Sequence, residues 1–172
     1  DCRDRGCTSL WRLSDAGGFV SARTYQGMGH VRAAAGPEDS IYLVAESSGP
    51  ADFGSGPIGT GTGARVARLD ASFVPLWTRD LAPVRVVDAL TTSASGRLHL
   101  GLQFPSGVSR LDFGSGRTFE AASGTELVLT LSETNHPAWV RAAGSNPMAS
   151  SPMRGRMTTN DEGWEIGRAS CR

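Results

Sequence analysis

The pentapeptide DFGSG occurs at Asp52–Gly56 and again at Asp112–Gly116, 60 residues further along a chain of 172 residues. The segments that follow the two copies are also paired. "ARVARLDASFVPLW" ends at Trp77, and "TELVLTLSETNHPAW" ends at Trp139, 62 residues later. Internal similarity at a fixed period is the sequence signature of repeat architectures. The pattern therefore predicts one structural unit that recurs about every 60 residues.

Other segments recur in the same order. "TSLWRLSDAGGFVSA" near the N-terminus aligns Leu13 with Leu69 and puts Ala22 where the tryptophan is expected. "EDSIYLVAE" (38–46) corresponds to "SGRLHLGLQ" (95–103), and "ALTTSASGR" (89–97) corresponds to "RMTTNDEGW" (156–164). Nearly every segment thus has a partner one period away.

Each segment has the pattern of a β-strand. Leu98, Leu100 and Leu102 alternate with polar or small residues, which is a period of two. Turn-forming residues separate the strands, as in "GPED" (36–39), "SASG" (93–96) and "NDEG" (160–163). One unit is predicted to be an antiparallel meander with DFGSG in the longer loop between its second and third strands, and the strands fall at about 84–92, 97–104, 126–132 and 137–142.

Both faces of such a sheet carry apolar residues. On the third strand, Val66 and Val128 point to the face opposite Leu69 and Leu131. Sheets covered on both sides by similar sheets fit a β-propeller, in which blades stack around an axis. A β-sandwich is the alternative, but it does not explain why the whole four-stranded unit recurs. We predict an all-β fold: a partial β-propeller of four-stranded antiparallel blades, with about two full blades and two partial ones.

The chain resembles the SBBP-type β-propeller repeats of bacterial cell-surface and secreted proteins. The resemblance covers nearly all of residues 8–164, and it departs from the family pattern at Phe73 and Asn135, which stand where the family usually has glycine. The matching segments are Ile41–Ala45, Asp52–Gly56, Ala67–Asp70 and Trp77, and then Leu98–Leu102, Asp112–Gly116, Leu129–Ser132 and Trp139.

The repeat predicts where the units begin and end. We expect a partial blade at 1–27, full blades at 28–80 and 81–142, and a partial blade at 143–164. "EIGRASCR" (165–172) resembles the translation of a sequencing-library adapter. We expect it to be foreign sequence that is irregular or poorly packed, with Cys171 unpaired, and the chain to be a fragment of a longer protein.

Composition excludes some classes of function. Seventeen basic and 17 acidic residues give a net charge of zero, so no basic surface for nucleic acid is expected. No apolar run approaches the roughly 20 residues that a membrane-spanning helix needs. With 39% apolar and 20% charged residues, the chain is expected to be globular.

The motifs with a catalytic reading favour structural roles instead. Asp-Phe-Gly holds metal in protein kinases, but the chain has no lysine for the kinase strand position. We therefore expect DFGSG to form a turn in which aspartate accepts backbone hydrogen bonds, phenylalanine anchors the loop and the glycines supply positive φ. His30, His99 and His136 lie in three segments without metal-ligand spacing. We expect no catalytic, cofactor-binding or metal-binding residues.

The residues singled out are structural. For Cys2 and Cys7 the choice is a loop disulfide or two free thiols, and the usual location of the resembled family implies the disulfide. The markers of the repeat are Asp52, Phe53, Gly54, Gly56 and Trp77 in one unit, and Asp112, Phe113, Gly114, Gly116 and Trp139 in the next.

The resemblance implies a non-catalytic, exported module for binding or surface display, outside the cytoplasm. Its expected partners are a protein or glycan ligand and the missing blades of the same chain, with no nucleic acid, no membrane span and no cofactor. The alternative is a fragment of a propeller enzyme, such as a quinoprotein-like dehydrogenase or a glycan lyase, whose active site lies in missing blades.

Overall fold

The computed structural model describes residues 7–105, 107, 110–112, 118–120, 125–145, 157–160 and 163–166. All regular secondary structure in these ranges is β-strand, and none of it is helix. The prediction of an all-β fold is confirmed. The strands that form sheets pair antiparallel throughout.

The described strands form three four-stranded sheets and two hairpins. Sheet A contains β1 (Cys7–Leu13), β2 (Phe19–Gln26), β5 (Ala51–Asp52) and β6 (Pro57–Ile58). Sheet B contains β3 (Val31–Ala35), β4 (Ile41–Ser47), β7 (Gly63–Leu69) and β8 (Pro75–Asp80). Sheet C contains β9 (Arg85–Thr92), β10 (Leu98–Gln103), β13 (Thr125–Leu131) and β14 (Pro137–Ser145). The hairpins are β11 (Arg110–Asp112) with β12 (Thr118–Glu120), and β15 (Met157–Asn160) with β16 (Gly163–Ile166).

Sheets B and C have the same strand order along the chain. Each is a meander whose second and third strands are joined by a longer connection that contains a small hairpin, β5–β6 or β11–β12. The strands of sheet C coincide with the four predicted strands to within three residues at each end. The small hairpin β5–β6 does not stay with its own sheet, because Asp52 pairs with Gln26 at the edge of sheet A.

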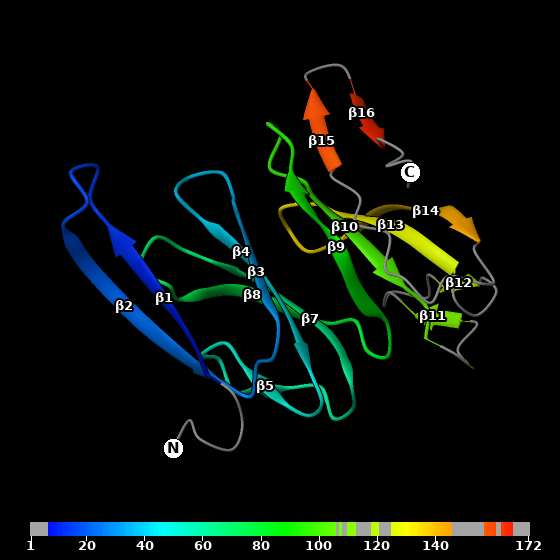
Figure 1. The fold of residues 1–172 in the computed structure, drawn as a ribbon, viewed down its shortest axis with the longest axis horizontal. Coiled ribbons are helices and arrows are strands. Elements are labelled where there is room, and N and C mark those ends of the chain that lie inside the picture. Colours follow the sequence, from blue (N-terminus) through cyan, green and yellow to red (C-terminus); the bar gives the residue numbers. More distant parts are fainter. Residues whose placement is uncertain are drawn as a thin grey trace, which may run out of the picture.

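Sheet B lies between sheets A and C (Figure 1). Alternate residues of β7 enter two different cores: Leu69 and Ala67 pack with Tyr25 from sheet A, and Val66 packs with Leu100 from sheet C. All of these side chains are almost completely buried. The period-two pattern of apolar residues therefore buries both faces of sheet B, as predicted. The described sheets lie side by side and do not close into a ring (Figure 1).

Four hairpin turns share one hydrogen-bond pattern. The first residue exchanges backbone bonds with the fourth and fifth, and its side-chain oxygen accepts the N–H of the fifth. This is a three-residue hairpin loop that ends in a left-handed residue. The four turns are Ser14–Gly18, Asp70–Val74, Ser93–Arg97 and Ser132–His136.

The fourth residue of each turn has positive φ: 77° at Gly17, 62° at Phe73, 71° at Gly96 and 65° at Asn135. Phe73 and Asn135 are the two positions where the resembled family usually has glycine. Both adopt the glycine-like backbone, although a left-handed conformation costs a phenylalanine roughly 1–2 kcal/mol. The turn geometry is thus kept without the glycine.

The register of the first hairpin corrects one alignment. Arg12 pairs with Ser21, as Arg68 pairs with Trp77, so Ser21 and not Ala22 stands at the tryptophan position. The stretch from Glu165 onward is not irregular throughout, and the alternative that it is poorly packed stays a prediction. Glu165 and Ile166 belong to β16 and pair with β15. Residues 167–172, including Cys171, lie outside the described residues.

The molecule has two distinct ends. The four turns just defined and the β3–β4 turn lie at one end of the sheets, which we call the turn end. The connections β2–β3, β4–β7 and β8–β9 lie at the other end, which we call the groove end. In Figure 1 the β1–β2 and β9–β10 turns stand toward the top, and the β5 loop lies at the bottom.

Candidate functional site

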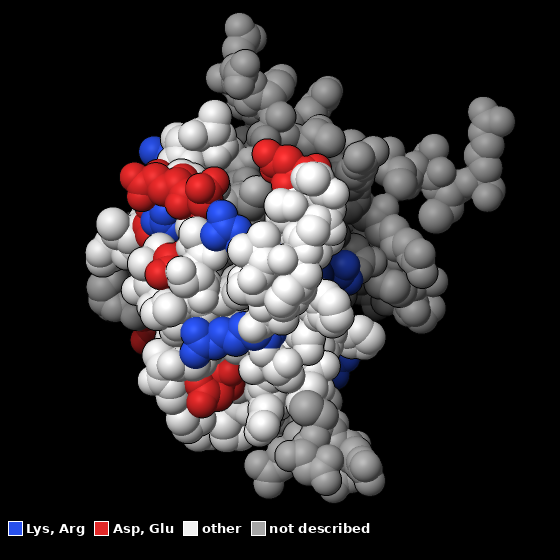
Figure 2. All heavy atoms as spheres, turned by 90° about the vertical axis from the view of Figure 1, so that its left-hand side faces the viewer, with Lys and Arg blue, Asp and Glu red and all other residues white. Residues whose placement is uncertain are grey.

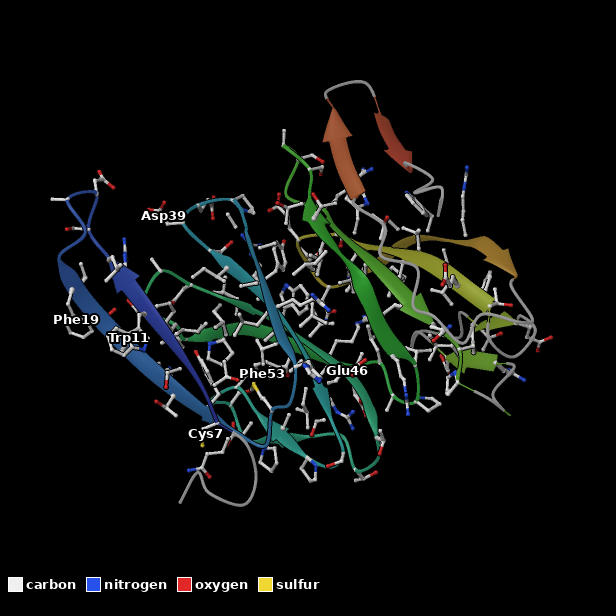
Figure 3. The ribbon with its side chains drawn as sticks, in the orientation of Figure 1. Cys7, Trp11, Phe19, Asp39, Glu46 and Phe53 are labelled. Carbon is white, nitrogen blue, oxygen red and sulfur yellow. The ribbon has the colours of Figure 1, made fainter. Side chains whose placement is uncertain are left out.

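The first DFGSG copy is a turn at the groove end. The Asp52 carboxylate accepts hydrogen bonds from the N–H groups of Gly54 at 2.6 Å and Gly56 at 3.1 Å. Both glycines have φ near 100°, which a side chain rarely permits. Phe53, labelled in Figure 3, is fully buried, and its ring centroid lies 6.3 Å from that of Tyr25. The carboxylate therefore stabilises the loop.

The second copy is only partly described. Asp112 ends β11 and pairs with Thr118, as Asp52 ends β5 and pairs with Pro57. Phe113, Gly114 and Gly116 lie outside the described residues. The equivalence of the two loops beyond their first residue stays a prediction.

The two marker tryptophans occupy the same register position on the last strand of their sheets. Trp77 donates its indole N–H to the carbonyl of Glu133 at 2.7 Å, and its ring lies 5.9 Å from that of Tyr42. Trp139 pairs with Thr130 and lies 6.1 Å from the ring of His99. Trp77 therefore joins sheet B to the β13–β14 turn of sheet C.

Two arginines of sheet A hold the β7–β8 turn of sheet B. Arg12 donates to the carbonyl of Ala71 at 2.9 Å, and Arg23 donates to the carbonyl of Phe73 at 2.8 Å. The Tyr25 hydroxyl donates to the same Phe73 carbonyl at 3.0 Å. The acceptors are the second and fourth residues of the turn.

Two arginines of sheet B hold the β13–β14 turn of sheet C in the same way. Arg68 donates to the carbonyl of Glu133 at 3.3 Å, and Arg79 donates to the carbonyl of Asn135. Arg79 also donates to the Asn135 side-chain oxygen at 2.6 Å. Arg12 and Arg68 each precede the last residue of their strand, and Arg23 and Arg79 each stand six residues after the left-handed turn residue. We call each such set an arginine pair.

The three histidines stay apart and build no common site. His99 is buried in sheet C, where its Nδ1 lies 2.8 Å from the Thr130 hydroxyl. Burial lowers the pKa of His99, and the nearby charge of Arg97 lowers it further. His30 lies at the groove end, and His136 lies at the turn end. In the part of the chain that the structure describes, no three His, Cys, Asp or Glu side chains gather in a way that could hold a metal ion.

Cys7 forms a disulfide bond. Cys2, its predicted partner, lies outside the described residues, so the pairing itself stays a prediction. A disulfide of any pairing is typical of proteins that mature in an oxidising compartment.

A groove of about 830 Å³ opens at the groove end of sheet B. His30, Glu46 and Arg85 are its charged or titratable residues, and a smaller hollow of about 160 Å³ beside Arg32 adjoins it. The N–H of Glu46 donates to the His30 carbonyl at 3.0 Å, which fixes the two residues across the strand ends. The remaining lining consists of glycines and hydroxyl residues together with the apolar Met28 and Pro50: Gly27, Met28, Gly29, Ser47, Ser48, Gly49, Pro50, Thr62 and Gly63.

The loop that leads to Gly63 is held by a buried cation. Arg65 is completely buried and donates to the carbonyls of Gly63, at 2.6 Å, and Gly61. Its Nε lies 3.4 Å from the Asp80 carboxylate. A side chain on Gly59 would overlap the guanidinium. The glycines of this loop therefore leave the space that the cation fills.

Sequence reasoning missed the groove. Its lining comes from the residues after β2, from the end of β4 and the residues after it, and from the positions where β7 and β9 begin, where glycine and serine look like ordinary loop residues. The groove could have been predicted from the common position of these loops at one end of an antiparallel meander. Binding residues are often found on loops that a rigid sheet holds in place.

None of the described residues belongs to a helix of the length and apolar character that crossing a bilayer requires. Comparisons with protein-family models, with curated proteins and with solved structures found no match for this chain.

Proposed function

We propose that this chain is a non-catalytic, exported module of the β-propeller type that binds a glycan or protein ligand in the groove at its groove end. The observation that carries the proposal is the use of the marker residues. Asp52 caps a turn, Phe53 fills a core and Trp77 joins two sheets. The marker residues that recur along the sequence therefore have structural roles.

The stacking of the sheets supports the propeller type. Sheets A, B and C follow one another face to face, and sheets B and C have the same strand order. The first strands of the two full meanders, β3 and β9, contact each other, and Thr92 donates to the carbonyl of Ala35 at 2.7 Å. Blades of a propeller stack in this manner, with their first strands innermost.

The groove supports a polar ligand. His30, Ser48 and Arg85 line the groove and are exposed. Exposed hydrogen-bonding side chains suit hydroxyl-rich sugars or an extended peptide. The disulfide of Cys7 supports export, because disulfides persist outside the reducing cytoplasm.

The test is binding of the full chain to immobilised bacterial polysaccharides and surface-protein fragments. We expect saturable binding that His30→Ala and Arg85→Ala weaken about tenfold or more, since one lost charge-assisted hydrogen bond is worth about that factor. His136→Ala is the matched control, because His136 is an exposed histidine at the opposite end. Chemical turnover of a bound glycan, or binding that His136→Ala weakens as much as His30→Ala does, would contradict the proposal.

A further inference from the structure

The basic side chains of the groove come from the first strands of two successive sheets. His30 directly precedes β3, Arg32 lies on β3, and Arg85 begins β9. Both strands begin at the groove end, and they contact each other. His30 and Arg85 line the groove, and Arg32 lines the adjoining hollow. The start of each strand therefore brings a basic side chain to the same opening.

The nearby carboxylates are already engaged in the fold. Glu46 is the one acidic side chain among the described residues that line the groove. It is half-buried on β4 beside Arg32, and each of these two residues has an interaction within the protein. Asp80 lies 3.4 Å from the Nε of the buried Arg65 and accepts the N–H of Ala82 at 2.9 Å. These carboxylates are therefore not available to neutralise the exposed cations of the groove.

His30 and Arg85 are the exposed side chains of the groove that can carry positive charge. Within the described part of the chain, neither side chain takes part in a hydrogen bond or an ion pair. The arginine fork matches the geometry of an oxyanion such as a carboxylate, and a histidine adds a further donor. The two side chains are thus available to a ligand that brings the negative charge.

The groove lacks the large aromatic side chains on which a neutral sugar ring could pack. None of the described lining residues is Trp, Tyr or Phe. The exposed hydroxyl groups of Ser48 and Thr62 offer neutral hydrogen bonds. Hydrogen bonds to an ionised group are roughly twice as strong as neutral ones. Binding in this groove therefore depends mainly on its cations, which favours an anionic ligand over a neutral one.

Outside the groove the two signs of charge are mixed. The chain has 17 basic and 17 acidic residues and no net charge. Figure 2, which looks from the side of β1 and β2, shows basic and acidic groups next to one another. A surface of this kind has no general attraction for a polyanion. Attraction of an anionic ligand should therefore be local to the groove.

We infer that the ligand of the groove is an anionic glycan, whose carboxylate or sulfate groups accept hydrogen bonds from Arg85 and His30. This inference rests on the proposed function, because it takes the groove as the binding site, and it adds the charge of the ligand. The groove, at about 830 Å³, lies in the range of about 300–1,000 Å³ that is usual for small-ligand sites. It therefore accommodates a short stretch of a polysaccharide.

The experiment measures binding of the full chain to two matched pairs of polymers by biolayer interferometry. Polygalacturonate is compared with its methyl ester, and dextran sulfate is compared with dextran, so that each pair differs only in the charged group. We expect at least one acid to bind about tenfold or more tightly than its neutral partner. The pair that responds identifies the anion. Raising the salt from about 0.1 M to about 1 M should weaken this binding, because the Debye length falls from about 10 Å to about 3 Å.

Variants of Arg85 separate its charge from its shape. Arg85→Gln keeps hydrogen-bond donors but removes the charge, so it should weaken binding of the acid about tenfold or more and leave binding of the neutral partner unchanged. Arg85→Lys keeps the charge and should retain most of the binding. Arg97→Gln is the matched control, because Arg97 is an exposed arginine at the turn end of the same β9–β10 hairpin. Circular dichroism of each variant checks that the sheets are intact.

The outcomes distinguish this inference from the proposed function. Equal binding of acid and neutral partner in both pairs overturns the inference and leaves the groove as a binding site. Saturable binding of surface-protein fragments without binding of either acid does the same. A loss in Arg97→Gln as large as that in Arg85→Gln also overturns the inference, because the polymer then binds outside the groove. Absence of saturable binding for every glycan and protein fragment overturns the proposed function as well.

Discussion

The turn end and the groove end are built from the same strands but in opposite ways. At the turn end, five residues make each connection, and the carbonyls of the β7–β8 and β13–β14 turns receive arginines from the neighbouring sheet. At the groove end, the connections differ in length: β2–β3 and β8–β9 have four residues each, β4–β7 spans residues 48–62, and glycines of β2–β3 and β4–β7 line an open groove. The difference suggests that one end fixes how sheets stack while the other is free to differ between units, as binding loops do.

The turn end also shows what the stacking depends on. The turn residue that receives an arginine is a buried phenylalanine in sheet B and a half-buried asparagine in sheet C. The side chain changes, while the positive φ and the accepting carbonyl are kept. The contact therefore recognises backbone geometry, and the side chain adds to it where it can, as Asn135 does for Arg79.

The largest expected effect concerns the strand residue beside the turn. Leu69→Ala should lower the free energy of unfolding by about 2–5 kcal/mol, because it leaves a cavity between sheets A and B. Leu13→Ala is the same substitution at the same register position on an exposed face, and it should cost less than about 0.5 kcal/mol. Urea unfolding followed by tryptophan fluorescence measures both. Equal losses would show that the exposed face of sheet A is covered in solution.

The next prediction compares how much Arg79 at the turn end and Arg85 at the groove end contribute to stability. Arg79→Ala removes the hydrogen bonds to Asn135 and should cost about 1.5–3 kcal/mol, the range for bonds to charged groups. Arg85→Ala, at the rim of the groove, should change stability by less than about 0.5 kcal/mol. The same unfolding assay compares them. A stability loss at Arg85 as large as that at Arg79 would remove the distinction between a stacking end and a binding end.

The capping aspartates test whether local turn chemistry differs between the ends. Asp70 accepts two backbone N–H groups at 2.8 Å at the turn end, and Asp52 does the same at the groove end. Asp70→Ala and Asp52→Ala should each cost about 0.5–1.5 kcal/mol, the net value of such bonds. Thermal unfolding followed by circular dichroism measures the loss of stability in both variants. A large loss for only one of them would mean that one loop carries additional contacts.

The smallest expected effect is a pH dependence. Burial lowers the pKa of His99, so the unfolded chain binds a proton more readily than the folded chain. Stability from this residue is complete above the unfolded pKa, about 6.5, and falls as the pH drops from there toward the folded pKa. His99→Gln should flatten this part of the stability curve, measured by urea unfolding at several pH values. His136→Gln, at an exposed position, should leave the curve as it is in the wild type.

The strands and turns could be predicted from sequence because their signals are local. The alternation of Leu98, Leu100 and Leu102 predicts the strand β10, and the DFGSG glycines predict a turn; the structure has both. The tryptophan position was predictable at Ser21 rather than Ala22, because Trp77 stands eight residues after Leu69 and Ser21 stands eight residues after Leu13. The structure keeps this spacing, since Gly17 follows Leu13 by four residues as Phe73 follows Leu69.

The arginine pairs could not be predicted, because an arginine on a strand usually points to solvent. Their hydrogen-bond partners lie 50 or more residues away, and nothing in the arginine's own segment indicates which residue the partner is. The pairing of Asp52 with Gln26 was hidden for a similar reason, since a two-residue strand has no period to detect. The groove needed the positions of separate loops, which only the folded sheets supply.

The buried side chain of Arg65 under the groove bears on the conformational entropy that its loop loses on folding. Glycine loses more backbone freedom on folding than any other residue, and the segment 59–63 contains three of them. Arg65 orders this segment with one side chain, through hydrogen bonds to the carbonyls of Gly61 and Gly63. The wall of the groove that includes Thr62 and Gly63 should therefore have slow amide exchange in the wild-type chain, and Arg65→Ala should speed exchange across the whole segment.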